Sequence, residues 1–166
     1  GFAEIRGFAL GTDGRGAERL TVRTGAMRYR RPKNDLRFDD SGNPVSSDYL
    51  FMDGAEILNF TLEMVPELVH DTLELNGLRQ DEVNLFIFHQ ANKYMLNFLR
   101  KKIRIPEEIF FYHLDKVGNT VSSTIPIALS AAINDGLIHP GDKVLIAGFG
   151  VGYSWAGNIL KFYDQT

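Results

Sequence analysis

Three short apolar segments, separated by stretches of helical periodicity, constrain the fold of this chain most strongly. They are VNLFIF (83–88), IFFYHL (109–114) and DKVLIAGFG (142–150). A short run of apolar residues without polar alternation is typical of a parallel strand that is covered on both faces. YSWAGNILKF (153–162) follows the third segment after a glycine turn and alternates, which predicts an antiparallel return strand.

Helical patterns precede and connect these segments. Residues 53–76 place apolar side chains on one stripe, and Asp53 is the expected N-cap. Pro66 lies inside this helix and is expected to kink or split it. Further helices are predicted at 90–103 and 120–134. The order of elements predicts an α/β layered domain with a mixed, mostly parallel sheet covered by helices.

The first third of the chain is less regular. Residues 2–10 and 18–25 are predicted to be strands, and residues 28–48, rich in Arg, Asp, Ser and Gly, are predicted to form a surface loop.

Composition excludes several classes of function. A net charge of −3 and a pI near 5.8 argue against a general nucleic-acid binder. No run approaches the length of a membrane helix, no signal peptide is visible, and a cytoplasmic location is expected. The chain has no cysteine, and its four histidines (His70, His89, His113 and His139) show no close ligand spacing, so we expect no metal site. Because it opens on Gly1 rather than Met, the chain is interpreted as a fragment or a trimmed form.

Three unusual loops follow the predicted parallel strands: HQAN (89–92), VGNT (117–120) and GFGVG (148–152). The carboxyl ends of parallel strands meet at one edge of a sheet, so His89, Asn119 and the glycine loop are expected to converge. Imidazole, amide and backbone N–H groups aimed at one point can stabilise an oxyanion. A carboxylate pair and a local nucleophile are missing, which indicates half of an acyl-transfer site. The alternative is structural: a hydrogen-bonded histidine at a strand end and an asparagine that caps a helix.

The three motifs, in this order and spacing, resemble the C-terminal half of the β-ketoacyl-acyl-carrier-protein synthase III family, which are thiolase-fold condensing enzymes. The segments YLFMDGAEILNFTLEMVPELV (49–69) and DGLIHPGDKVLIAGFG (135–150) are similar to the family as well. The resemblance implies a C-terminal thiolase-like domain at 49–166. Residues 1–48 would be strands and a loop linking to a missing N-terminal half. Residues 2–10 would be the last strand of that half and are expected to lack their sheet.

The resemblance also implies a reaction in fatty-acid biosynthesis. A cysteine in the N-terminal half accepts an acyl group from acyl-CoA, and malonyl-acyl-carrier protein then loses CO₂ and attacks it; no cofactor is needed. His89 and Asn119 would hold the malonyl thioester oxygen, Phe149 would lie beside the cysteine, and Asn92 would support the pocket. The backbone of Gly150, Val151 and Gly152 would hold the oxygen of the acyl thioester.

The resemblance implies partners too: acyl carrier protein, the N-terminal half, and a second copy in a homodimer when the protein is complete. The expected docking residues for carrier protein are the basic ones on and after the helix that follows HQAN: Lys93, Arg100, Lys101, Lys102 and Arg104. A solvated helix face is the alternative. The chain departs from the family pattern at Tyr94, where an arginine is common, and at Val151, where glycine is usual.

Two other functions stay open. The chain could be a non-catalytic partner subunit that completes a heterodimer, or part of a related thiolase-fold acyltransferase of specialised metabolism. In each case the isolated chain, without the cysteine, is expected to be inactive in condensation.

Overall fold

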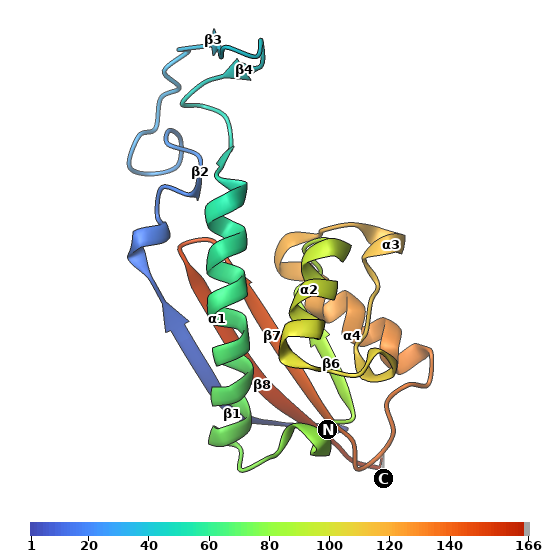
Figure 1. Ribbon diagram of the computed structural model, residues 1–166. Helices are drawn as coiled ribbons and strands as arrows, with labels where there is room; N and C mark the ends of the chain where they lie inside the picture. Colours follow the sequence, from blue (N-terminus) through green and yellow to red (C-terminus); the bar gives the residue numbers. More distant parts are fainter. Residues whose placement is uncertain (165–166) are drawn as a thin grey trace.

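The structure, a computed structural model, describes residues 1–164 and has one four-stranded sheet with helices on both faces (Figure 1). The strand order is β1-β8-β7-β6. β6 and β7 are parallel, whereas β8 is antiparallel to both β7 and β1. The mixed α/β sheet is confirmed, but the parallel pairing is confined to β6 and β7. The bounds are β1 Ala3–Thr12, β6 Leu85–Phe88, β7 Lys143–Gly150 and β8 Ser154–Phe162.

The helices bury both faces of the central strands. α1 (Gly54–Leu75) and α2 (Lys93–Ile103) pack on the face that carries Phe86 and Phe88. α4 (Thr124–Asn134) packs on the other face through Ala128 and Ala132, against Leu85 and Ile87 of β6. All four β6 residues are therefore buried, which explains why this strand has no polar alternation. No helix within residues 1–164 combines the length and apolar character needed to cross a bilayer.

The helix boundaries follow their capping groups. Asp53 caps α1 as predicted, accepting a hydrogen bond from Glu56 N at 3.2 Å. The helix then continues through Pro66, so of the two expected effects the split does not occur, and the kink stays a prediction. α2 begins at Lys93 rather than residue 90, because Asn92 is its N-cap. α4 begins at Thr124 rather than residue 120, because a 3₁₀ turn, η4 (Val121–Ser123), precedes it.

The predicted strand at 109–114 does not form. The segment holds the 3₁₀ turn η3 (Glu107–Ile109) and the short helix α3 (Leu114–Val117), with a single parallel bridge between Phe110 and Phe86. The buried side chain of Gln90 takes the place of further ladder bonds. It donates to Phe88 O at 2.7 Å and accepts from His113 N at 2.8 Å. A side chain that bonds the backbone in this way competes with regular sheet pairing.

β1 pairs with β8 from Ala3 to Thr12, so the expectation that residues 2–10 lack a sheet is wrong. The register shifts between Ile5 and Phe8, which marks a bulge. The side-chain amide of the buried Asn158 donates to Arg6 O at 2.6 Å and so satisfies a carbonyl within the bulge.

Residues between β1 and α1 form an arm that projects beyond the N-terminal end of α1 (Figure 1). The predicted surface loop is confirmed, and Asp48 organises it by accepting hydrogen bonds from Thr24 Oγ1, Lys33 N and Asn34 N. The predicted strand at 18–25 is reduced to two residues. The short elements here are η1 (Gly14–Gly16), β2 (Leu20–Thr21), β3 (Arg37–Phe38), β4 (Pro44–Val45) and β5 (Phe51–Met52), with β2 paired to β5 and β3 to β4.

Candidate functional site

His89 lies at the carboxyl edge of the parallel strand pair. Its backbone N donates to Ala147 O at 2.8 Å, which extends the β6–β7 ladder one residue past β6. The imidazole ring meets the Phe149 ring edge to face, with 5.6 Å between centroids and 82° between planes. The structure therefore brings the end of β6 and the end of β7 together at one edge, as the sequence predicts.

The His89 ring is anchored by a threonine from α4. Nδ1 of His89 lies 2.7 Å from Oγ1 of Thr124, whose side chain is buried. The ring itself is half-buried, and this burial lowers the pKa of His89 below its ordinary value. The imidazole is therefore neutral at pH 7 and can present the hydrogen on one nitrogen as a donor.

The lowered pKa predicts how stability depends on pH. Between the pKa of His89 in the unfolded chain, about 6.5, and its lower value in the folded chain, the unfolded state binds more protons. The free energy of unfolding should therefore rise with pH across this window and be reduced below it. An NMR titration of the histidines checks the cause: His89 should titrate at lower pH in the folded chain than in the unfolded chain. Titration of the folded His89 at or above its pH in the unfolded chain would contradict the prediction.

Asn119 joins the same hydrogen-bonded group of residues. Its Oδ1 accepts from Val121 N at 2.9 Å, which turns the side-chain NH₂ away from this contact and leaves it free to donate. Oγ1 of Thr124 lies 3.0 Å from Val121 O. Val121 therefore links Asn119 to Thr124, and Thr124 contacts His89. These links support the predicted convergence of His89 and Asn119 on one oxygen atom, which stays a prediction.

The glycine loop is the hairpin between β7 and β8. Gly150 ends β7, and Gly152 has a φ of 126°, a conformation that side chains rarely adopt. Val151 between them is 56% exposed. Phe149 is buried and packs against the His89 ring, beside the hairpin. The role of this backbone as an oxyanion hole stays a prediction.

The two amides of HQAN have structural contacts. Asn92 Oδ1 accepts from Met95 N at 2.8 Å, the contact of a helix N-cap. Gln90 bridges β6 to the segment before α3, as described above. The sequence predicted neither the burial of Gln90 nor the contact between Thr124 and His89, because only the fold brings Thr124 beside His89.

The predicted docking residues divide into two groups. Arg100 bonds Glu107 Oε2 at 3.0 Å and Ile105 O at 3.3 Å, and its side chain is only 12% exposed. Lys102 Nζ donates to Leu62 O at 2.6 Å. These two side chains hold α2 against its neighbours. Lys102 is nevertheless exposed, as are Lys93, Lys101 and Arg104, whose side chains form no such contact within residues 1–164.

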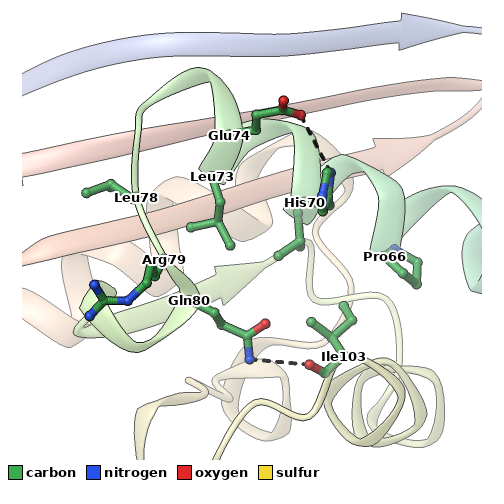
Figure 2. Close-up of a pocket in the computed structure, with 9 residues that line it drawn as sticks. Pro66, His70, Leu73, Glu74, Leu78, Arg79, Gln80 and Ile103 are labelled. Carbon is green, nitrogen blue, oxygen red and sulfur yellow. Dashed lines mark hydrogen bonds and ion pairs between the residues drawn. The ribbon is translucent and has the colours of Figure 1, made fainter.

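A surface cleft of about 340 Å³ lies elsewhere, between the C-terminal half of α1 and the turn η2 (Gln80–Glu82) (Figure 2). Gln80 lies shortly before the start of β6. Ile103 is the last residue of α2, which begins after the carboxyl end of β6 and runs back toward its amino end. The cleft therefore lies at the amino edge of the sheet. His70, Asp71 and Glu74 are close enough there to share an ion, but all three are exposed surface groups. Ligand sites of such sheets form at the carboxyl edge, where His89 lies. The lining residues are Pro66, Val69, His70, Leu73, Glu74, Leu78, Arg79, Gln80 and Ile103.

Comparisons with known proteins identify relatives of this chain. The family described as 3-oxoacyl-[acyl-carrier-protein (ACP)] synthase III C terminal matches residues 73–162. Beta-ketoacyl-[acyl-carrier-protein] synthase III of Clostridium tetani is 31% identical over 158 residues, which cover 95% of this chain and 47% of that protein. The same-named protein of Acaryochloris marina is 32% identical, over 95% of this chain and 46% of its own length.

Solved structures give the same result. A 3-oxoacyl-(acyl-carrier-protein) synthase III crystal structure matches with a TM-score of 0.90 and 42% identity, covering 95% of this chain and 48% of that one. The synthase III of Thermus thermophilus matches with a TM-score of 0.79 and 31% identity, over 95% of this chain and 46% of its own. The chain thus spans about half the length of the relatives that it matches.

Proposed function

This chain belongs to the 3-oxoacyl-[acyl-carrier-protein] synthase III family, and we propose that it is the C-terminal half of an enzyme that condenses an acyl-CoA with malonyl-acyl-carrier protein in fatty-acid biosynthesis. The observation that carries the proposal is the neutral His89 ring at the carboxyl edge of β6, anchored by Thr124 and packed against Phe149 beside the glycine hairpin. The N-terminal half, acyl carrier protein and a second copy are the partners that this proposal assigns.

In the proposed reaction this chain provides hydrogen-bond donors. A cysteine of the N-terminal half first holds the acyl group as a thioester. His89 and Asn119 then donate to the carbonyl oxygen of the malonyl thioester. The bond to the carboxylate breaks, CO₂ leaves, and its electron pair forms an enolate whose negative oxygen the two donors stabilise.

The enolate carbon next attacks the acyl thioester. A tetrahedral oxyanion forms there, and backbone N–H groups of the hairpin at Gly150, Val151 and Gly152 stabilise it. The intermediate collapses with departure of the cysteine thiolate, which leaves a 3-oxoacyl group on the carrier. A neutral His89 suits the decarboxylation step, because it donates a hydrogen bond without carrying a charge that would attract the departing carboxylate.

One comparison favours a second candidate. The priming β-ketosynthase of the R1128 polyketide pathway matches with a TM-score of 0.80 and 28% identity over 98% of this chain. A condensing enzyme that primes a specialised product would keep the same donors and differ in its acyl substrate. The heterodimer subunit without its own catalysis is the other alternative.

The test of the proposal is an assay of the complete protein with malonyl-acyl-carrier protein and a panel of acyl-CoA starters. We expect CO₂ release and a 3-oxoacyl carrier product with short fatty acyl starters. Product with only an unusual starter would favour specialised synthesis, and no product with any starter would contradict the enzyme proposal.

The exposed basic residues of α2 predict where carrier protein docks. Reversing Lys93 and Lys101 to glutamate should raise the KM for malonyl-acyl-carrier protein and make its salt dependence shallower, because exposed charges act mainly on association with an acidic partner. Reversal of Lys116, another exposed lysine outside α2, is the matched control. An unchanged KM at low salt in the double variant would leave these residues as a solvated helix face.

A further inference from the structure

We propose that Thr124 is a positioning residue that holds His89 in the tautomer with hydrogen on Nε2, so that Nε2 faces the substrate as a donor. The inference rests on the proposed function for its purpose, but the tautomer is a property of this chain alone. It concerns the contact between the His89 ring and the first turn of α4, which the sequence did not indicate.

The direction of the Thr124 hydroxyl hydrogen determines which nitrogen of His89 carries the ring hydrogen. The Thr124 hydroxyl has one hydrogen and two possible acceptors, His89 Nδ1 at 2.7 Å and Val121 O at 3.0 Å. If the hydrogen points to Nδ1, the ring hydrogen must be on Nε2. If it points to Val121 O, then Nδ1 carries the ring hydrogen and Nε2 is only an acceptor. The second arrangement cannot stabilise an enolate oxygen through His89.

One contact and one distance favour the first arrangement. The backbone N–H of Thr124 already donates to Val121 O, so this carbonyl keeps a partner when the hydroxyl turns away. Nδ1 of His89 is bonded to Thr124 Oγ1 in either arrangement, but the distance of 2.7 Å is typical of a hydroxyl donor, whereas a ring N–H donor is usually farther from its acceptor.

Backbone strain next to Thr124 indicates that this segment has a functional role. Val121 has a φ of 56°, which is rare for a β-branched residue. Its N–H donates to Asn119 Oδ1 and its carbonyl accepts from Thr124 N. Strained residues persist only where their surroundings hold them, and they gather at functional sites. Here the strained residue orients the Asn119 amide through its N–H and the backbone of Thr124 through its carbonyl.

The tautomer can be measured directly on this chain. With ¹⁵N-labelled histidine, two- and three-bond correlations between ring protons and ring nitrogens distinguish a protonated from an unprotonated nitrogen. His89→Gln identifies the His89 signals. At pH values where His89 is neutral, we expect protonated Nε2 and unprotonated Nδ1. The opposite pattern would overturn the inference without any variant of Thr124.

Two variants separate positioning from packing. Thr124→Val keeps the shape of the side chain but removes the hydroxyl, and should give a mixture of the two tautomers. Thr124→Ser keeps the hydroxyl and should retain the wild-type pattern. A Thr124→Val chain that folds and keeps the wild-type tautomer would overturn the role of Thr124.

In the complete enzyme, Thr124→Val should lower kcat for malonyl decarboxylation by about 10- to 100-fold, the range for residues that orient a functional histidine. Acylation of the cysteine and the KM for the malonyl substrate should change little, and Thr124→Ser should restore kcat. Equal loss with valine and serine would overturn the positioning role. A wild-type enzyme that is inactive although its tautomer is the expected one would instead contradict the proposed function.

Discussion

Replacing His89 by alanine in the complete enzyme is expected to slow decarboxylation of the malonyl thioester by about two to three orders of magnitude, the usual cost of one preorganised oxyanion donor. Acyl transfer from acyl-CoA to the cysteine should persist. The reason is that the two half-reactions place negative charge at different points. In the proposed reaction, enolate charge forms at the oxygen that faces His89 and Asn119, whereas acylation places charge at the hairpin backbone beside the cysteine.

The two half-reactions can be followed separately, as CO₂ released from malonyl-carrier protein and as acyl label bound to the enzyme. Asn119→Ala should show the same split as His89→Ala, since in the proposed reaction both donate to one oxygen. His70→Ala is the matched control, because His70 is exposed at the amino edge of the sheet, where its Nδ1 lies 3.4 Å from Asp71 and 3.9 Å from Glu74. If His89→Ala reduced both half-reactions equally, His89 would have a different role.

Elements whose formation depends on local periodicity were predictable from the sequence. The apolar patterns correctly predict the strands β6, β7 and β8 and the helix α1 with its Asp53 cap. Each of these elements buries a complete face, so its pattern of apolar residues indicates its type and position. The edge on which HQAN and the glycine loop meet followed from the same strands and the rule for parallel sheets.

Elements decided by side-chain contacts across the fold were not predictable. The segment 109–114 has the composition of a strand. The Gln90 side chain, however, bonds Phe88 O and His113 N, which are backbone groups that a longer ladder would pair. The contacts of charged side chains were not predictable for the same reason. Arg100 and Lys102 look like part of a basic surface in the sequence, yet the first bonds Glu107 and the second a carbonyl of α1. Within residues 1–164, the candidates that are exposed and whose side chains form no such bond are Lys93, Lys101 and Arg104.

The sequence was enough to propose the candidate site by residue type, but not to find the residues that support it. His89 and Asn119 became candidates because each follows an apolar segment, and their shared role stays a prediction. Thr124 could not, because nothing in GNTVSST distinguishes the threonine that reaches the imidazole from its polar neighbours. The link depends on η4, whose strained Val121 is a consequence of contacts rather than of local preference.

The chain also exposes an apolar face that a partner is expected to cover. Ile5, Phe8 and Leu10 of β1 are 65%, 53% and 73% exposed, although they belong to a strand of the central sheet. Exposed apolar side chains grouped on one strand are typical of an interface. In the proposed function the N-terminal half covers this face, and the lone chain is expected to self-associate through it.

The isolated chain is expected to form no covalent adduct with any acyl-CoA. Acyl transfer needs an activated nucleophile, and the chain has no cysteine. Ser122, Ser123 and Ser154 are exposed, but a serine needs a dedicated base, and within residues 1–164 none of these hydroxyls is hydrogen-bonded to a histidine. Nδ1 of His89 is already bonded to Thr124.

Intact-mass measurement after incubation with a labelled acyl-CoA tests this expectation. The lone chain should keep its mass, whereas a mixture with the N-terminal half should gain one acyl group, on the cysteine of that half. Replacing that cysteine by alanine is the control and should abolish the gain. In the proposed function, this chain holds the donors for two oxyanions and the other half holds the group that attacks, so neither half alone would complete the reaction. An adduct on the lone chain would show that it has a nucleophile of its own.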